Sequence, residues 1–353
     1  MTPAASTPAA STSAPLRQGY ECLLLDLDGT LYRGSDVVPG AVQALEGSTE
    51  RLLFVTNNAS KSPAAVARHL SDLGFVASEN DVVTSSQAAA RLLAERLESG
   101  SKVLIVGTQA LADEVELLGL VAVRSADDEP AAVVQGHSME TAWPALAEAA
   151  FAIRAGALWI ATNTDATLPT ERGLAPGNGS MVAAVRAATD RDPIVAGKPA
   201  APLLEDALQR SGTRSAMVVG DRLDTDIEGA NTVGLDSLLV LSGVSTADDL
   251  LRALPDRRPT YLAFSLASLD QPSSDPGDSW SAKFTGTDIE LSGSGDATAA
   301  LAVTAAIAWA HPEFGAVVTS SPEAEDAVRS WTNQSDRTST LAVSLPAPPR
   351  DID

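Results

Sequence analysis

Two aspartates, two residues apart, follow directly after an apolar run near the start of the chain. The run is Cys22–Leu25, and Asp26 and Asp28 come next, followed by Gly29 and Thr30. Along an extended backbone, side chains two positions apart face the same side. Both carboxylates can therefore enter one pocket at the carboxyl end of a strand, where open α/β sheets bind ligands. Such a pair can attack an electrophile, transfer a proton and hold a divalent cation.

Three further groups of polar residues end apolar runs or begin helix-like segments. The Thr56 hydroxyl and the Asn57 backbone amide, at the end of one run, can donate hydrogen bonds to a phosphate oxygen. Lys198 stands between Gly and Pro at a predicted helix start, where its charge opposes the helix macrodipole and favours an anionic partner. Asp221 ends another apolar run and Asp226 follows five residues later. Carboxylates of this kind suit Mg²⁺.

Each of the four groups also has a purely structural interpretation. The first pair can be a solvated acidic turn, and Thr-Asn-Asn after a strand is ordinary turn chemistry. A lysine is usually solvated, and Asp226 can cap the helix-like run that follows it. The four groups nevertheless occur together, each at a strand end or a helix start. This shared placement favours one common site over four independent coincidences.

In this order and placement, the segments resemble the motifs of the haloacid dehalogenase-like (HAD) phosphatases. The matching segments are Asp26-Leu-Asp-Gly-Thr-Leu-Tyr-Arg-Gly34, Thr56-Asn-Asn58, Gly197-Lys-Pro199 and Gly220-Asp-Arg-Leu-Asp-Thr-Asp-Ile227. They resemble most the branch with a large α/β cap between the second and third motifs. That branch includes nitrophenyl phosphatase-like, phosphoglycolate, pyridoxal phosphate and glycerol 3-phosphate phosphatases. The resemblance covers residues 20 to about 265.

The resemblance implies Mg²⁺-dependent hydrolysis of a phosphomonoester. Asp26 would attack phosphorus and form an aspartyl-phosphate, while Asp28 would protonate the leaving alkoxide and then activate water. Asp26, Asp221 and the backbone carbonyl of Asp28 would hold Mg²⁺, and Asp226 would orient a water of the metal. The residues implied to hold the phosphate oxygens are Thr56, Asn57 and Lys198.

A polar loop in the inserted segment matches the part of the cap that, in this family, hangs over the active site and helps to choose the leaving group. Its candidate residues are Asn163, Asp165, Asn178 and Gly179. From the residues alone, a structural role as a polar loop and helix cap is equally open. His137 departs from the aromatic or acidic types expected after Gly136, and it can line the substrate pocket or serve the fold.

The elements that must position these groups alternate between apolar strand-like runs and helical patterns over most of the chain. This alternation predicts an α/β fold with a doubly wound, Rossmann-like parallel core. The core strands are expected at 22–25, 51–55, 82–84, 193–196, 216–219, 238–241 and 261–264. A second set of strands indicates an inserted α/β cap, with expected strands at 103–106, 121–123, 132–134 and 158–161.

The predicted division of the chain has five parts. They are a disordered tail (1–16), the HAD core (17–100 and 190–268), the inserted cap (101–189), a turn-rich linker (269–281) and a small C-terminal α+β appendage (282–353). The appendage should contain a strand-like run at 282–291, a helix at 297–310, a strand at 316–319 and a helix at 322–331. Because the appendage lacks a Gly-rich loop for a pyrophosphate, we expect it to pack on the core or a partner.

Charge and composition exclude several classes of partner. The 353 residues include 46 acidic and 24 basic side chains, which gives a net charge of −22. This balance disfavours nucleic acids and anionic membrane surfaces, which bind through Lys and Arg. No signal peptide or membrane span is evident. The single cysteine, Cys22, excludes an intramolecular disulfide and fits a reducing compartment, so we expect the cytoplasm.

The sequence thus predicts a Mg²⁺-dependent phosphomonoester hydrolase whose large cap leaves room only for a small phosphorylated metabolite. Glycerol 3-phosphate is the first choice. Phosphoglycolate and pyridoxal phosphate are alternatives, because the motifs at the phosphoryl end do not encode the leaving group. A function of another class, a non-hydrolytic phosphate-binding or regulatory protein with an acyltransferase-like C-terminal module, is the remaining alternative. We expect no nucleic acid or membrane partner and leave a homodimer open.

Overall fold

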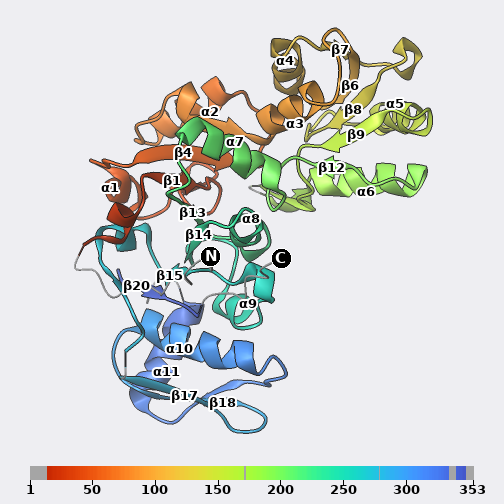
Figure 1. The fold of residues 1–353 in the computed structure, drawn as a ribbon. Coiled ribbons are helices and arrows are strands. Elements are labelled where there is room, and N and C mark those ends of the chain that lie inside the picture. Colours follow the sequence, from red (N-terminus) through yellow and green to blue (C-terminus); the bar gives the residue numbers. More distant parts are fainter. Residues whose placement is uncertain (1–13, 171, 278, 334–338, 347–353) are drawn as a thin grey trace, which may run out of the picture.

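The computed structural model describes residues 14–170, 172–277, 279–333 and 339–346. The core sheet lies at the centre of the view, the inserted cap at the upper right and the C-terminal unit at the bottom (Figure 1). Most of the predicted tail lies outside the described residues. However, Leu16, the last residue of the predicted tail, is buried and its backbone N–H donates to the carbonyl of Gln271, so this residue belongs to the folded part.

The core is an eight-stranded sheet, and six consecutive strands of it, from β15 to the edge strand β5, are parallel, which confirms the predicted α/β class. The strand order is β16-β20-β15-β14-β13-β1-β4-β5. The parallel strands are β1 (Cys22–Leu25), β4 (Arg51–Thr56), β5 (Val82–Thr84), β13 (Ala216–Gly220), β14 (Asp236–Val240) and β15 (Tyr261–Ala263). Since β1 lies between β13 and β4, the polar residues that follow these three strands meet at one edge of the sheet.

Helices cover both faces of the core sheet. One face packs against α3 (Ser85–Ala94), α7 (Ala201–Ser211) and α8 (Glu228–Thr232), and the other against α1 (Ala41–Leu45) and α2 (Pro63–Asp72). Local sequence fixes where the helices begin. Ser62 accepts the backbone N–H of Ala65 ahead of Pro63, and Thr84 forms a capping box with Gln87.

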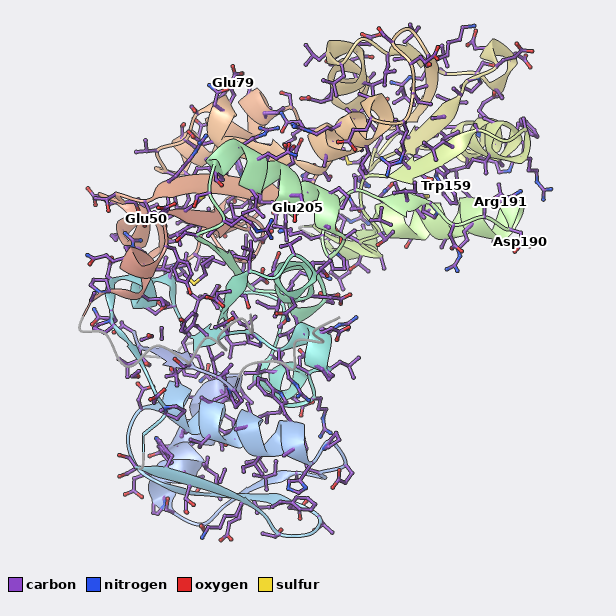
Figure 2. All side chains as sticks on the ribbon, in the orientation of Figure 1. Glu50, Glu79, Trp159, Asp190, Arg191 and Glu205 are labelled. Carbon is purple, nitrogen blue, oxygen red and sulfur yellow. The ribbon has the colours of Figure 1, made fainter. Side chains whose placement is uncertain are left out.

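The cap is built on a second, five-stranded parallel sheet with the order β12-β9-β8-β6-β7. Its strands are β6 (Lys102–Val106), β7 (Val121–Val123), β8 (Ala132–Gln135), β9 (Leu158–Ala161) and β12 (Ile194–Val195). Its helices are α4 (Gln109–Leu117), α5 (Trp143–Arg154) and α6 (Asn178–Thr189), with a hairpin formed by β10 (Thr167–Thr170) and β11 (Gly173–Pro176). Trp159 and Asp190 mark this unit in Figure 2, well away from Glu50 on the core.

The prediction of a core strand at 193–196 is wrong. Residues Ile194–Val195 form β12, which pairs with β9 at the edge of the cap sheet, so the cap sheet extends past the predicted boundary at 189. The places beside β1 in the core are taken by β13 and β4. Apolar periodicity identifies a strand but does not say which of two neighbouring sheets it joins.

The C-terminal unit differs from the predicted appendage in two ways. The run at 282–291 is two strands, β17 (Trp280–Phe284) and β18 (Ile289–Gly293), because the chain turns at Gly286, whose φ is +99°. They form a small sheet with β19 (Val317–Thr319), under α10 (Ala297–Ala310) and α11 (Pro322–Thr332). Furthermore, the unit returns a strand to the core, since β20 (Ala342–Ser344) lies antiparallel to β15.

The predicted linker also carries structure. A 3-10 turn occupies Leu266–Asp270, and β16 (Ser273–Ser274) pairs with β20 in the core sheet. The far end of the chain beyond residue 346 lies outside the described residues. Within the described ranges, no helix combines the length and apolarity needed to cross a membrane.

Candidate active site

Three buried or half-buried carboxylates gather where β1 and β13 end. Asp26 follows β1 directly, and Asp221 follows β13, the strand paired with β1. Asp226 lies in a short π-helical turn at Leu223–Ile227, just before α8. One oxygen of each carboxylate lies within 4.8 Å of one oxygen of each of the others. The parallel pairing of the two strands therefore brings together residues that are almost two hundred positions apart.

Lys198 supplies the positive charge at the centre of this group. Its Nζ lies 2.6 Å from Asp26 Oδ1 and 2.7 Å from Asp226 Oδ1, and it also donates to the Val55 carbonyl at 3.1 Å. The side chain is 2% exposed. Burial alone would lower the pKa of Lys198, but Asp226 and Asp26 outweigh it and raise that pKa, so the ammonium stays charged.

Asp221 is held in one orientation by donors from two loops. The Thr30 hydroxyl donates to its Oδ1 at 3.2 Å, and the Val244 backbone N–H donates to its Oδ2 at 2.5 Å. A Cβ on Gly243 would lie 1.8 Å from the same Oδ2, so only glycine fits beside this carboxylate. The loop that follows β14 therefore forms part of the wall around Asp221.

The electrostatics of the cluster fit a divalent cation. Burial raises the pKa of Asp221, and repulsion from Asp26 and Asp226 adds to the shift. Burial and repulsion from Asp26 likewise raise the pKa of Asp226, although Lys198 opposes them. Three carboxylates face one ammonium, so a bound cation would let all three ionise. Oxygen ligands of this charge and number suit Mg²⁺.

Asp226 is already bonded through both of its oxygens. Oδ1 accepts from Lys198 at 2.7 Å and Oδ2 accepts from the Arg222 backbone N–H at 3.1 Å. Asp26 Oδ2, in contrast, accepts a long contact of 3.4 Å from the Thr30 hydroxyl. This difference fits direct metal binding by Asp26 and an orienting role for Asp226.

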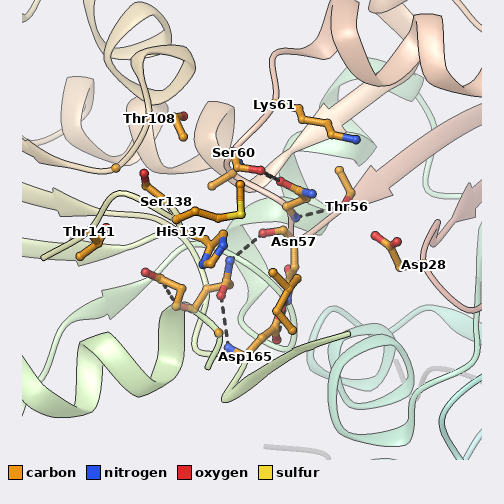
Figure 3. Close-up of a pocket in the computed structure, with 18 of the residues that line it drawn as sticks. Asp28, Thr56, Asn57, Ser60, Lys61, Thr108, His137, Ser138, Thr141 and Asp165 are labelled. Carbon is orange, nitrogen blue, oxygen red and sulfur yellow. Dashed lines mark hydrogen bonds between the residues drawn. The ribbon is translucent and has the colours of Figure 1, made fainter. Parts of the chain in front are cut away.

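Asp28 lies on the open side of the cluster and lines the wall of a large pocket. The surrounding protein raises the pKa of Asp28 by burial, although the charges of Lys61 and Lys198 oppose the shift. Figure 3 shows the Lys61 side chain on the same side of the pocket as Asp28 and Thr56. Sequence reasoning missed Lys61, which stands in a polar loop five residues after Thr56 and has no strand-end position of its own.

The two predicted phosphate-binding residues at the end of β4 have different surroundings. Thr56 is buried, lines the pocket, and its hydroxyl accepts the Asn58 backbone N–H at 3.0 Å. The Asn57 side chain is used internally, since it donates to the Lys198 carbonyl at 3.0 Å and accepts the Lys198 N–H at 2.8 Å. Its amide also lies 3.3 Å from Asp165 Oδ1, so Asn57 connects the lysine loop to the cap.

Three of the four predicted cap residues hold the cap loop in place. Asn163 donates to the Asn57 carbonyl at 2.7 Å, and Asn178 donates to the Asn163 carbonyl at 2.8 Å. A Cβ on Gly179 would lie 2.1 Å from the Thr164 carbonyl oxygen. Asn163, Asp165 and Asn178 all line the pocket, but the two asparagines are buried whereas Asp165 is partly exposed; burial nevertheless raises the pKa of Asp165.

The pocket has a volume of about 1380 Å³ and is lined by core and cap residues together. Its cap wall carries polar residues from the ends of β6 and β8, shown in Figure 3 opposite Asp28. They are Thr108, His137, Ser138 and Thr141. Burial lowers the pKa of His137, so its ring is neutral near pH 7, and no partner for its Nε2 occurs among the described residues. The structure therefore places His137 at the pocket.

Comparisons with known proteins agree with this arrangement. A family model described as haloacid dehalogenase-like hydrolase matches residues 23–121, and a second, HAD-hydrolase-like, matches residues 195–269. The chain is 61% identical over 258 residues to the D-glycerol 3-phosphate phosphatase of Mycobacterium tuberculosis, covering 73% of each protein.

Solved structures show the same likeness. A glycerol phosphate phosphatase from Mycobacterium tuberculosis in complex with magnesium matches with a TM-score of 0.87 and 50% identity, covering 91% of this chain and 99% of the other. The p-nitrophenyl phosphatase from Archaeoglobus fulgidus matches with a TM-score of 0.65 and 28% identity, over 71% of this chain and 97% of the other. Both neighbours are phosphatases, in agreement with the resemblance drawn from the motifs.

Proposed function

The chain belongs to the haloacid dehalogenase-like hydrolase family, and we propose that it is a Mg²⁺-dependent phosphatase that hydrolyses glycerol 3-phosphate. One observation carries the proposal. Lys198 contacts Asp26 and Asp226 at 2.6 and 2.7 Å, within a cluster of three carboxylates at the base of a pocket. Positive charge and hydrogen-bond donors gathered there can stabilise a transferring phosphoryl group, even in so acidic a chain.

Asp26 is the proposed nucleophile. Its free carboxylate oxygen attacks phosphorus, the bond to the leaving oxygen breaks, and an aspartyl-phosphate forms. Asp28, whose raised pKa favours the protonated form, gives its proton to the leaving alkoxide. The same carboxylate then takes a proton from water, which attacks phosphorus and restores Asp26. The Thr56 hydroxyl and the Asn57 backbone N–H hold the phosphate oxygens. Lys198, whose three N–H groups are donated to Asp26, Asp226 and the Val55 carbonyl, exchanges one of these contacts for a phosphate oxygen when the substrate binds.

Asp26, Asp221 and the backbone carbonyl of Asp28 are the proposed magnesium ligands. When bound, Mg²⁺ lowers the repulsion between the carboxylates and the phosphate and stabilises charge on the transferring group. Thr30 and Val244 keep Asp221 turned toward the cluster, and Asp226 keeps its contact with Lys198.

The cap wall supports glycerol as the leaving group. Thr108, His137, Ser138 and Thr141 offer neutral donors and acceptors, which suit the hydroxyls of a polyol. Phosphoglycolate would instead place a carboxylate here, and the charged residues on the cap side of the pocket are one cation, Arg124, and three acids, Glu140, Glu148 and Asp165. The division into a core and a closing cap, with β12 counted at the edge of the cap sheet, stays a proposal, as do the homodimer and the cytoplasmic location.

Phosphate release from a panel of small phosphomonoesters, with Mg²⁺ and with a chelator, tests the proposal. Glycerol 3-phosphate should give the highest kcat/KM and the chelator should abolish release. A higher kcat/KM for phosphoglycolate or pyridoxal phosphate would replace the substrate and keep the chemistry. Substrate binding without any release, with Mg²⁺ present, would favour the phosphate-binding alternative instead.

A further inference from the structure

The loop that follows β14 connects the carboxylate cluster to α9 (Ala247–Leu251). Within this loop, the Val244 N–H donates to Asp221 Oδ2 and the Ser245 N–H donates to the Asp221 carbonyl at 3.1 Å. The Ser245 hydroxyl also accepts the Leu223 N–H at 3.0 Å. Two backbone donors of this loop therefore set both the main chain and the carboxylate of Asp221.

The helix after the loop is short and depends on its neighbours. A helix of five residues has little stability of its own, so lateral packing must hold it. Thr246 caps its first turn, and Leu250 is fully buried in the apolar cluster that joins the core to the C-terminal unit. The position of α9 is thus determined by what packs on Leu250.

The C-terminal unit supplies that packing. Helix α10 lies against α9, and the Trp309 indole N–H donates to the Leu250 carbonyl at 2.9 Å. The Arg252 guanidinium lies 4.5 Å from the centre of the Phe314 ring and donates to the Gly315 carbonyl at 3.2 Å. These three contacts join the C-terminal end of α9 to residues beyond position 300.

A direct contribution of this unit to the pocket is excluded for the described residues. The residues that line the pocket end at Val244, whereas the C-terminal unit begins at β17. Any influence on the site must therefore pass through an element that contacts both. Helix α9 and the preceding loop, at 242–246, form such an element.

We propose that the C-terminal unit positions the magnesium site, with Trp309 as the positioning residue that acts through α9 and Val244 on Asp221. The inference rests on the proposed role of Asp221 as a metal ligand. Without the contact to Leu250, α9 and its loop gain conformational freedom, and the Val244 N–H no longer fixes the carboxylate. Cation affinity then falls because the site must be ordered when the ion binds.

The test is calorimetric titration of Mg²⁺ into the full-length protein without substrate, comparing Trp309→Phe with wild type. The phenyl ring keeps most of the packing and removes the donor to Leu250. We expect the Mg²⁺ dissociation constant to rise three- to tenfold, a loss of binding free energy on the scale of one hydrogen bond. At saturating Mg²⁺ the kcat should stay within about twofold of wild type, because no catalytic group is altered.

The matched control is Trp280→Phe. Its indole N–H also donates to a backbone carbonyl at 2.9 Å, that of Asp296, and the side chain is similarly buried, but this contact stays inside the C-terminal unit. It should lower the free energy of unfolding comparably and leave Mg²⁺ affinity unchanged. Equal Mg²⁺ affinities in Trp309→Phe and wild type, or equal weakening in both variants, would overturn the proposal.

A second variant guards against loss of folding. Phe314→Leu removes the ring under Arg252 and should weaken Mg²⁺ binding in the same direction; unchanged binding in a folded Phe314→Leu protein would also count against the proposal. If the wild type itself binds no Mg²⁺, the metal assignment fails, which is a different outcome from equal binding in wild type and variants.

Discussion

Asp26 and Asp28 are separated by one residue, yet their surroundings differ. Asp26 contacts the Lys198 ammonium at 2.6 Å, whereas Asp28 lines the pocket, where the charges of Lys61 and Lys198 oppose the effect of burial on its pKa. Two carboxylates placed in unlike environments can take unlike roles. Burial raises the pKa of both carboxyl groups, but at Asp26 the Lys198 ammonium in direct contact opposes this shift and favours the ionised nucleophile, whereas the raised pKa of Asp28, at the pocket, suits a proton donor.

Metal binding should depend on Asp221 far more than on Asp224. Asp221 faces the other carboxylates, while Asp224 forms an ion pair with Arg222 at 2.9 Å on the half-exposed side of the turn. Asp221→Ala should weaken Mg²⁺ binding at least tenfold, which is about 1.4 kcal/mol. Asp224→Ala should change it less than about threefold. Similar dissociation constants for the two variants by calorimetry would contradict the placement of the metal.

The pH dependence of stability should report on Asp165. Burial raises the pKa of Asp165 in the folded protein, above its unfolded value of about 3.9. The contribution of protonated Asp165 to the free energy of unfolding is therefore fully present below the unfolded pKa and is lost as the pH rises through the folded pKa. Asp165→Asn cannot ionise, so its stability does not fall in this way as the pH rises, and its amide oxygen still accepts the hydrogen bond from the Asn57 side chain.

The stability difference between Asp165→Asn and wild type should consequently grow in favour of the variant as the pH rises above the unfolded pKa of about 3.9. Urea unfolding at a fixed Mg²⁺ concentration measures it at each pH. A difference that stays constant or shrinks as the pH rises would show that Asp165 ionises in the folded protein without cost.

At the residue scale, position after a strand was the informative signal. Asp26, Asp28 and Asp221 could be placed because a parallel sheet brings its strand ends to one edge. Lys61 and Thr108 could not, since their approach to the pocket depends on loop conformations. A polar type also does not show whether an amide faces substrate or protein, as the internal contacts of Asn163 illustrate.

At the element scale, the loop between β14 and α9 is the part of the site that no sequence motif predicted. Its backbone N–H groups, rather than its side chains, contact Asp221. Hydrogen bonds from the backbone do not depend on the type of side chain, so a sequence seldom reveals them. The exception here is Gly243, because a Cβ at this position would clash with Asp221. The assignment of β12 failed for a related reason, because its pairing with β9 depends on tertiary contacts.

Gly243→Ala should damage the metal site with little effect on the fold. The added Cβ would lie 1.8 Å from Asp221 Oδ2, so the carboxylate has to turn away from the cluster. We expect at least tenfold weaker Mg²⁺ binding by calorimetry. Gly19→Ala is the control, since its Cβ would meet nothing within 4 Å. Wild-type Mg²⁺ affinity in Gly243→Ala would show that the loop moves to accommodate the added Cβ without displacing the Asp221 carboxylate.

At the scale of the whole molecule, the C-terminal unit is joined to the core in two ways. It adds β20 to the core sheet beside β15, and it buries α10 against α9. Helix α10 is buried on most of its surface, in keeping with a helix that is apolar all round. The predicted appendage is therefore continuous with the core in sheet and in apolar packing.

Deleting residues 276–353 should yield mostly insoluble protein. The deletion uncovers the edge of β15 and apolar side chains such as Leu250 and Phe264. Phosphatase activity should remain in the small soluble fraction, with kcat within an order of magnitude and a higher Mg²⁺ requirement. A soluble, folded and inactive truncation would instead place part of the C-terminal unit in the active site.

The central claim is that Asp26 carries the phosphoryl group, and trapping that species tests it most directly. In Asp28→Asn the base for the second step is missing, while 4-nitrophenyl phosphate has a leaving group that needs no proton. With Mg²⁺, we expect a burst of one nitrophenolate per active site, followed by slow turnover. Acid quench and peptide mass spectrometry should then find phosphate on the peptide that contains Asp26. Nitrophenolate release with no phosphorylated peptide, or with phosphate on another peptide, would contradict the account.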